Sequence, residues 1–224
     1  SSLVEFTTHS MRDIKGGIIE VRPFQYNHIT KSLRVVKSLD VTLYQKNRGE
    51  DIQPQVVDQD FYGLYSHIYA NFDHFHFIPS NVTGNMLIIT DSTYADSANK
   101  LAGYKKDMGI NATVQIVDAS ESADNIKKIV VDNYNSKSGL TYLTFIGKNI
   151  KTFTSSSTYY ESDSMYSEIT SAKSWDIFVS RITGNEQDHI DWQLYKIQKY
   201  PTYSGAWIKN YVAGCDDESA QGEP

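Results

Sequence analysis

The stretch Gly84–Lys100, GNMLIITDSTYADSANK, decides the fold class of this chain. A short apolar run, Met86–Ile89, stops at Thr-Asp-Ser, and a helical pattern begins immediately afterwards. A buried parallel strand that leads into the helix covering it has this pattern. The sequence therefore predicts a strand at Met86–Ile89 and a helix over Thr93–Met108, with Gly109 ending the helix.

The same alternation of strand and helix continues along the rest of the chain. Further strands are predicted at Thr113–Val117, Tyr142–Gly147, Asp176–Arg181 and Trp207–Cys215. Three helices carry apolar residues at helical spacing: Tyr94, Ala98, Leu101 and Met108; Ile126, Ile129, Val130 and Tyr134; and Ile190, Leu194 and Ile197. Ser120 or Ser122 is expected to cap the second helix. Strands that alternate with helices predict a parallel sheet with helices on both faces, so this part is α/β.

The first part of the chain has a different pattern. Strands are predicted at Gly16–Asn27, Ser32–Val36 and Leu39–Gln45, and no helical period is evident, so this part is expected to be all-β. We therefore predict two units, a β-rich segment over residues 1–75 and an α/β unit over residues 76–224.

Composition excludes several classes of partner. The 224 residues carry a formal net charge of −6, which argues against binding to nucleic acid or an anionic membrane. The chain has no apolar run near the roughly 20 residues that a membrane span needs. Cys215 is the one cysteine, so the chain has no internal disulfide framework.

Two motifs have the residue types of a ligand site, and each has a simpler explanation. A helix that starts at Asp91-Ser92-Thr93 could hold an anion, but the motif lacks the glycines of a phosphate cradle, so Asp91 or Ser92 is expected to cap the helix. His74 and His76 would share one face of a strand, but a zinc site needs three or four ligands. We expect Phe75 and Phe77 to pack inward there instead.

The region near the C-terminal end offers two candidate catalytic arrangements. His189 and Cys215 have the residue types of a thiol–imidazole dyad, but no feature of the sequence brings them within hydrogen-bond reach, so we reject the pair. Asp216 and Asp217 follow a predicted parallel strand, the usual location of sites in α/β proteins. From the residues alone, a solvated acidic loop is the favoured interpretation of this pair.

Several segments, taken in order, resemble the gingipain family. Gly16–Gln45 is similar to the end of a gingipain-type prodomain at Val21, Pro23, Tyr26, Asn27, Thr30, Lys31, Leu33, Arg34 and Val35. Tyr104, Lys105 and Gly109 match the first helix of the catalytic domain. The stretches LTYLTFIGKN, YYESDSMYS and WDIFVSRIT resemble later family motifs, so the resemblance covers roughly residues 16–224.

The resemblance implies an activity and an architecture. Gingipains are secreted bacterial cysteine endopeptidases, made as zymogens, with a caspase-like fold. Residues 1–75 would be the C-terminal part of a prodomain, and residues 76–224 the first catalytic subdomain with the start of the second. The catalytic histidine and cysteine would lie beyond this chain, so the chain alone is expected to be inactive. Its partners would be the remainder of the catalytic domain and protein or peptide substrates, at a secreted or cell-surface location.

The resemblance also assigns two site residues. Ala213-Gly-Cys-Asp216 matches a motif whose acid orients the catalytic histidine, which makes Asp216 the candidate for that role. The family requires no cofactor but binds structural calcium, and Asp176 is the candidate ligand here. Two alternatives stay open: a gingipain-like scaffold that has lost its dyad, and a protein- or glycan-binding module that uses the tyrosine-rich surface and residues 152–174.

Overall fold

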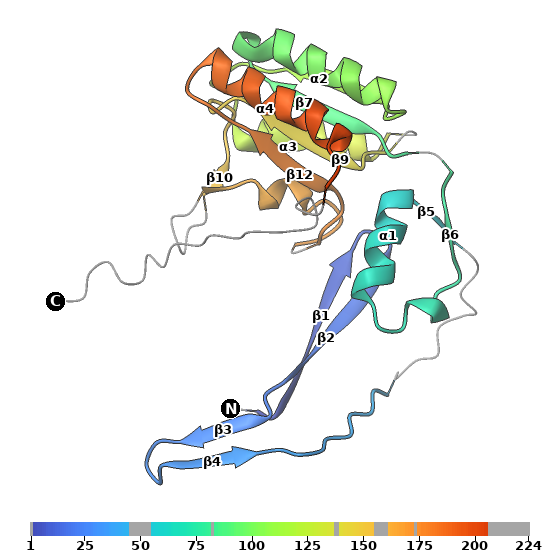
Figure 1. Cartoon of the computed structure of the whole chain (residues 1–224), viewed down its shortest axis with the longest axis vertical. Helices are drawn as coiled ribbons and strands as arrows, with labels where there is room; N and C mark the ends of the chain where they lie inside the picture. The colour runs from blue at the N-terminus through green and yellow to red at the C-terminus, as the bar shows by residue number, and fades with distance from the viewer. Residues whose placement is uncertain are drawn as a thin grey trace, which may run out of the picture.

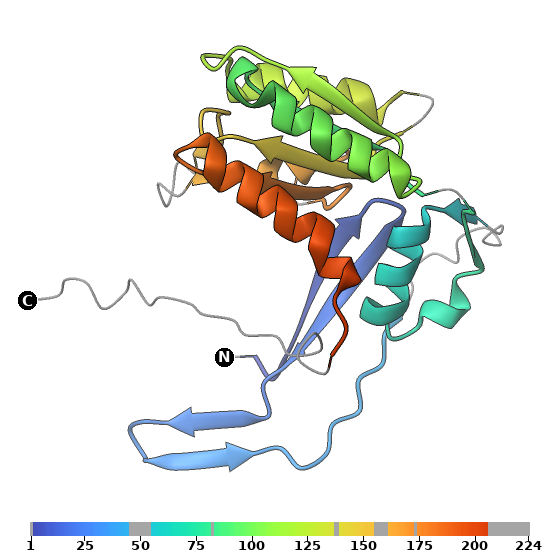
Figure 2. The same cartoon turned by 45° about the horizontal axis from the view of Figure 1, so that its top comes forward.

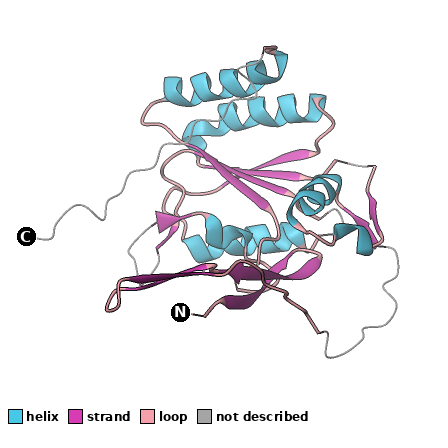
Figure 3. Ribbon diagram, turned by 60° about the horizontal axis from the view of Figure 1, so that its bottom comes forward, coloured by secondary structure: helices cyan, strands magenta, loops and turns pink. Residues whose placement is uncertain are grey.

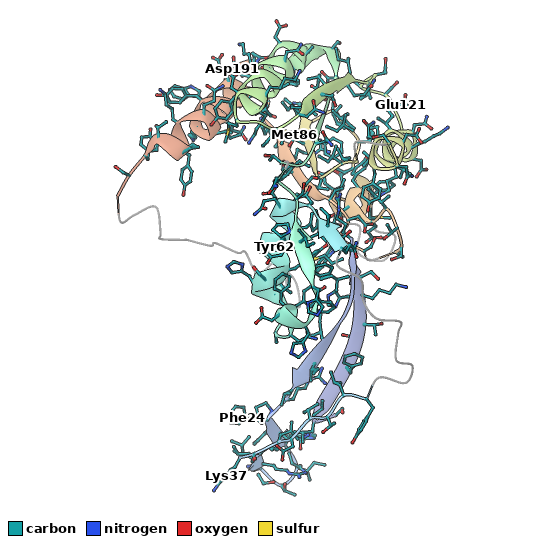
Figure 4. All side chains as sticks on the ribbon, turned by 90° about the vertical axis from the view of Figure 1, so that its right-hand side faces the viewer. Phe24, Lys37, Tyr62, Met86, Glu121 and Asp191 are labelled. Atoms are coloured by element: carbon teal, nitrogen blue, oxygen red, sulfur yellow. The ribbon has the colours of Figure 1, made fainter. Side chains whose placement is uncertain are left out.

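The computed structural model of the chain describes residues 2–44, 55–81, 83–136, 139–154, 161–172 and 174–205. Within it, an α/β unit (described residues 83–205) contains the largest sheet, and two β-hairpins project away from this unit (Figure 1). Phe24 and Lys37 lie in the far hairpin region, well separated from Met86 inside the α/β unit (Figure 4).

The sheet of the α/β unit has four parallel strands. They are β7 (Met86–Thr90), β8 (Ala112–Ile116), β9 (Tyr142–Ile146) and β12 (Phe178–Ile182), in the order β12-β9-β7-β8. The register places Met86 beside Ala112 on one side and beside Tyr142 on the other. All five residues of β7 are buried, as expected for a central strand of a sheet covered on both faces.

Three helices cover the two faces of this sheet. Helices α2 (Ala95–Asp107) and α4 (Gln187–Lys199) lie side by side on one face, and α3 (Ala123–Tyr134) lies on the other (Figures 2 and 3). Alternate residues of β7 supply the two cores: Met86 and Ile88 pack with α2 and α4, whereas Leu87 and Ile89 pack with α3. The predicted parallel α/β architecture is confirmed.

The helix boundaries follow local signals in the sequence. Ser122 caps α3 by accepting a hydrogen bond from a backbone N–H, which settles the choice between Ser120 and Ser122. Gly109 has a φ of +87° just after α2, as its predicted role as a stop requires. Met108 was expected on the apolar face of α2, and this is wrong: it is the C-terminal cap and is 49% exposed.

Shorter elements complete the α/β unit. They are η2 (Ser92–Tyr94), β10 (Phe153–Thr154), β11 (Glu161–Ser162), η3 (Ser164–Ser167) and η4 (Tyr200–Thr202). The predicted strand Asp176–Arg181 begins at Phe178 instead, because Asp176 is a buried residue of the preceding turn. The predicted strand Trp207–Cys215 lies outside the described residues. None of the helices in the described ranges has the length and apolar character that a membrane crossing requires.

The N-terminal hairpins differ from the prediction in two ways. β1 (Val4–Met11) pairs with β2 (Ile14–Val21), and β3 (Phe24–Asn27) pairs with β4 (Ser32–Val35). The expected single strand Gly16–Asn27 is therefore two strands, which separate at Arg22-Pro23 because proline lacks the N–H that a ladder needs. The strand expected at Leu39–Gln45 is wrong over 39–44, where the described chain forms no strand pairing.

The expectation that this first part is all-β is also wrong. Between β5 (Gln55–Val57) and β6 (Phe77–Pro79) lie helix α1 (Gln59–Ile68) and the short helix η1 (Phe72–His74). α1 forms because Phe61 and Tyr65, four residues apart, are both buried, and because Asp58 caps its first turn. The boundary between residues 75 and 76 remains a prediction.

Candidate functional site

The carboxyl edge of the sheet, where β7, β9 and β12 end, is the place where α/β proteins of this kind carry their sites. Asp91 directly follows β7 and is only 2% exposed. Its carboxylate accepts hydrogen bonds from Thr93 N at 2.8 Å and from Asn149 Nδ2 at 3.1 Å. The predicted capping role of Asp91 is confirmed, and the same carboxylate also fixes the loop after β9.

Gly147 directly follows β9, at a point where the backbone conformation requires a glycine. Its φ is +104°, a backbone conformation that L side chains rarely adopt. A Cβ atom at this position would lie 2.8 Å from a ring carbon of Tyr94. The Gly147 N–H donates to Ile182 O at 2.9 Å, which ties the end of β9 to the end of β12.

Arg181, in β12, organises the loop that follows β9. Its guanidinium forms a bidentate ion pair with Asp163, with both N–O distances at 2.7 Å. Nη1 also donates to the carbonyls of Gly147 and Ile150, both at 3.0 Å, and the guanidinium lies 4.8 Å from the ring centroid of Phe145. One side chain thus joins the sheet to two separate points of the loop.

Tyr166 anchors the same loop from the apolar side. The side chain is fully buried, and its ring packs 4.7 Å from Phe145 and 4.9 Å from Phe153, measured between centroids. Its hydroxyl donates to Lys151 O at 2.6 Å. Burial raises the pKa of Tyr166 to about 12.

Lys127 of α3 forms hydrogen bonds with the next turn of the loop. Its Nζ donates to the carbonyls of Met165, Tyr166 and Glu168 at 2.7, 3.0 and 3.0 Å. Burial lowers the pKa of Lys127, while the nearby Glu168 and Asp176 oppose that shift. The ammonium group therefore provides hydrogen-bond donors for three backbone carbonyls, and its role is to stabilise the loop.

Asp176, the candidate calcium ligand, lies at the opposite, amino edge of the sheet and is fully buried. Its carboxylate accepts hydrogen bonds from Ile169 N, Thr170 N, Thr170 Oγ1 and Ser174 Oγ, at 2.6 to 3.1 Å. These partners are N–H and O–H donors, whereas Ca²⁺ needs six to eight oxygen ligands. The surroundings of Asp176 do not fit a calcium ion, and its carboxylate holds together the turn 169–174.

The histidines do not build a metal site in the described part of the chain. His74 and His76 are exposed, and His74 ends the short helix η1, so the strand predicted through these residues is wrong. Phe75 and Phe77 stack on each other with centroids 5.5 Å apart, and Phe77 packs against the buried cluster of Phe61 and Tyr65. The described residues contain no cluster of three or more histidine, cysteine or acidic side chains suited to a metal ion.

Most of the candidate catalytic residues lie outside the described part of the chain. His189 lies on the exposed surface of α4, and Cys215, Asp216 and Asp217 lie outside the described residues. Within the described part of the carboxyl edge, the carboxylates of Asp91 and Asp163 and the guanidinium of Arg181 bind groups of the protein itself and hold the loop after β9 in place.

The loop-fixing contacts were missed by sequence reasoning. Asp163 and Arg181 both belong to segments that carry the family resemblance. Their pairing could not be predicted, because a contact between a loop residue and a strand residue leaves no periodic signal in the sequence. Lys127 gave no signal either, since a lysine on a helix is usually a solvent-exposed residue.

Comparison with known proteins identifies the family of the chain. The model of peptidase family C25 matches residues 80–223. Gingipain R2 of Porphyromonas gingivalis is 21% identical over 201 residues, which cover 85% of this chain and 27% of that protein. Gingipain R1 of the same species is 21% identical over 199 residues, which cover 85% of this chain and 20% of that protein. The chain thus spans about a quarter or less of these relatives.

Two solved structures are similar at a low level. The Arg-specific cysteine proteinase gingipain R has a TM-score of 0.49 and 20% identity, over 52% of this chain and 28% of that chain. The complex of the RgpB pro- and mature domains of Porphyromonas gingivalis has a TM-score of 0.47 and 18% identity, over 52% of this chain and 29% of that chain. The family model, which matches more than half of the present residues, is the finding that decides membership: the chain belongs to peptidase family C25, the gingipain family of cysteine peptidases.

Proposed function

We propose that this chain is the N-terminal portion of a secreted cysteine endopeptidase zymogen that hydrolyses peptide bonds in proteins. The observation that carries the proposal is the family match over residues 80–223, which includes the whole parallel sheet. Because the chain spans only 27% of gingipain R2, the activity belongs to a longer parent protein.

In this proposal the two parts of the chain have different tasks. Residues 1–75 form the C-terminal part of the prodomain, and residues 76–224 form the first catalytic subdomain with the opening of the second. The dyad histidine and cysteine lie in the remainder of the catalytic domain, which is the first partner of this chain.

Asp216 is assigned the role of positioning residue in the parent enzyme. Peptide hydrolysis would proceed through a thioester: the cysteine thiolate attacks the peptide carbonyl, and the histidine transfers a proton to the leaving amine. Water, deprotonated by the same histidine, would then attack the thioester, which releases the carboxylic acid and restores the thiolate. A carboxylate that accepts the second imidazole N–H fixes the histidine tautomer and stabilises the imidazolium. Asp216 would supply that carboxylate. The substrates would be proteins or peptides. The parent enzyme would encounter them outside the cell or at the cell surface, the location that the family implies.

The proposal is tested on the full-length parent. A thiol-reactive peptidyl probe should label it, and Asp216→Asn should lower kcat about 10²- to 10⁴-fold and shift the pH–rate profile, because the histidine loses its orienting partner. Asp217→Asn is the matched control and should leave kcat and the pH–rate profile nearly unchanged. If the probe does not label the parent, the chain belongs to an inactive scaffold or a binding module. If Asp216→Asn and Asp217→Asn behave alike, the role of Asp216 is wrong.

A further inference from the structure

Arg12 occupies an unusual position at the tip of the β1–β2 hairpin. It is one of the two residues between the paired positions Met11 and Ile14. Its φ is +43°, in the left-handed region that suits glycine or asparagine far better than arginine. A long charged side chain at such a turn is normally solvated, but the Arg12 side chain is only 16% exposed. The contacts of the guanidinium explain why the side chain is so little exposed.

The guanidinium of Arg12 is enclosed by two carbonyls and two aromatic rings. Nη1 donates to Leu140 O at 2.8 Å and to Asp176 O at 2.9 Å. The central carbon lies 4.9 Å from the ring centroid of Phe61 and 5.3 Å from that of Tyr134. A guanidinium is weakly hydrated, presents five N–H donors and stacks on aromatic faces, so carbonyl oxygens and aromatic rings can hold it when it leaves water. The Asp13 carboxylate also lies beside it, with Oδ2 3.9 Å from Arg12 Nε. The arrangement is therefore a guanidinium-binding site.

This site lies at the amino edge of the parallel sheet. Leu140 and Asp176 precede β9 and β12 by two residues each. The neighbouring Ser10 O accepts a hydrogen bond from Trp175 N at 3.3 Å, so the hairpin tip itself touches the same edge. Asp91, Gly147 and Arg181 mark the other end of these strands. The hairpin is thus attached on the side of the sheet away from the carboxyl edge.

Helix α1 completes the same contact. Phe61 stacks on Phe178 of β12 with centroids 4.6 Å apart, and Asp58 accepts a hydrogen bond from Thr141 Oγ1 at 2.6 Å. From the other side, Tyr65 donates from its hydroxyl to Asp13 Oδ2 at 3.0 Å. α1 therefore packs beside the hairpin tip, and both α1 and the tip contact the amino edge of the sheet directly.

We propose that Arg12 holds the hairpin segment, residues 2–44, on the rest of the chain as a separable partner. The segment would stay attached by non-covalent contacts when the backbone is cut between residues 45 and 54, because its tip occupies the guanidinium site. Within the described residues, the hairpin tip makes these contacts at the amino edge of the sheet. The inference concerns binding alone and requires no catalytic step, so it can fail or succeed independently of the proposed peptidase function.

The test uses the whole 224-residue chain with a site-specific protease sequence in place of residues 47–52. After cleavage, we expect the two pieces to elute together, and labelled pieces to give a measurable Kd. Arg12→Ala should weaken that Kd about 10- to 100-fold, since hydrogen bonds to a charged donor are lost. Arg12→Lys should also weaken it, because a lysine cannot bridge two carbonyls as a planar fork does.

Two controls separate the site from a general effect on folding. Arg22→Ala removes an exposed arginine of the same hairpin, paired with Glu5 and Glu20, and should leave the Kd nearly unchanged. Millimolar guanidinium chloride should partly restore binding in Arg12→Ala, whereas equal sodium chloride should not. If Arg12→Ala does not fold before cleavage, the Kd of Arg12→Lys is compared with that of the wild type instead. Wild-type pieces that separate, or an Arg12→Lys variant that binds like wild type, would overturn the proposal.

Discussion

Arg181 of β12 and Asp163, just before η3, form a bidentate ion pair in which each of two nitrogen–oxygen distances is 2.7 Å. The side chains are only 15% and 20% exposed, so both charges depend on each other for compensation. The pair spans the loop after β9 and the last part of β12. Among the described residues, this ion pair joins the loop after β9 to the carboxyl edge of the sheet.

Replacing Asp163 with asparagine should destabilise the chain markedly. The substitution keeps the shape of the side chain but leaves the largely buried Arg181 charge without its partner. Breaking a buried pair costs about 3–5 kcal/mol, and the remaining exposure reduces the expected loss to roughly 2–4 kcal/mol. The free energy of unfolding in urea measures this loss.

Arg22 provides the control for that experiment. It forms ion pairs with Glu5 and Glu20 at 2.9 and 2.7 Å, but the side chains are 39% to 55% exposed. An exposed pair contributes about 0–1 kcal/mol, so Arg22→Gln should change the free energy of unfolding by less than about 1 kcal/mol. Equal losses in Asp163→Asn and Arg22→Gln would show that the Asp163 pair has no special structural role.

Gly147→Ala should be strongly destabilising. The φ of +104° is costly for alanine, and the new Cβ would lie 2.8 to 2.9 Å from the ring of Tyr94. We expect a loss of at least about 2 kcal/mol in the free energy of unfolding, because strain and steric overlap act together. Gly103→Ala is the matched control: Gly103 lies within α2, and a Cβ added there would meet no atom within 4 Å, so this change should stabilise the chain by about 0.5–1 kcal/mol. A loss at Gly103 as large as at Gly147 would contradict this account.

The sheet and its helices could be predicted because their signals are local. β7 is apolar at nearly every position that it buries, and Ser122 and Gly109 mark helix ends by their own chemistry. α1 was not predicted because it contains Gly63, a poor helix former, and because its buried residues, Phe61 and Tyr65, belong to a segment rich in aromatics. Its stability comes from packing that includes Phe178, which is far away in the sequence.

The functional contacts could not be predicted for a related reason. Arg12 contacts a carbonyl 128 residues away and Asn149 binds a carboxylate 58 residues away, and neither contact belongs to a repeating pattern. A sequence shows which residues are able to form such contacts. The three-dimensional arrangement of the strand ends decides which of them meet.

Tyr166→Phe should change the dependence of stability on alkaline pH. Because burial raises the pKa of Tyr166 to about 12, the folded chain keeps the phenol proton that the unfolded chain loses near pH 10. The contribution of Tyr166 is therefore fully present below pH 10 and is lost as the pH rises through 12. At neutral pH, Tyr166→Phe should cost about 1 kcal/mol, since the hydrogen bond to Lys151 O is lost.

Urea unfolding at a series of pH values from about 8 to 12 measures the difference. Above about pH 10, wild type should lose stability more steeply than Tyr166→Phe. The slope should become smaller in the variant without vanishing, because burial also raises the pKa of Tyr65 and of Tyr142. Parallel curves for the two proteins would mean that Tyr166 titrates normally in the folded chain.

The environment of Asp176 predicts that calcium does not stabilise the described fold. A ligand that binds the folded state alone adds about 2.7 kcal/mol when its concentration is 100 times its Kd. We expect no such gain: the unfolding midpoint should be the same in millimolar Ca²⁺ and in excess chelator. Asp176→Asn should nevertheless cost about 2–4 kcal/mol in either buffer, because an amide nitrogen would face the N–H and O–H donors of Ile169, Thr170 and Ser174. A calcium-dependent rise in the midpoint that Asp176→Asn abolishes would instead make this carboxylate a metal ligand and overturn its role as the organiser of the turn.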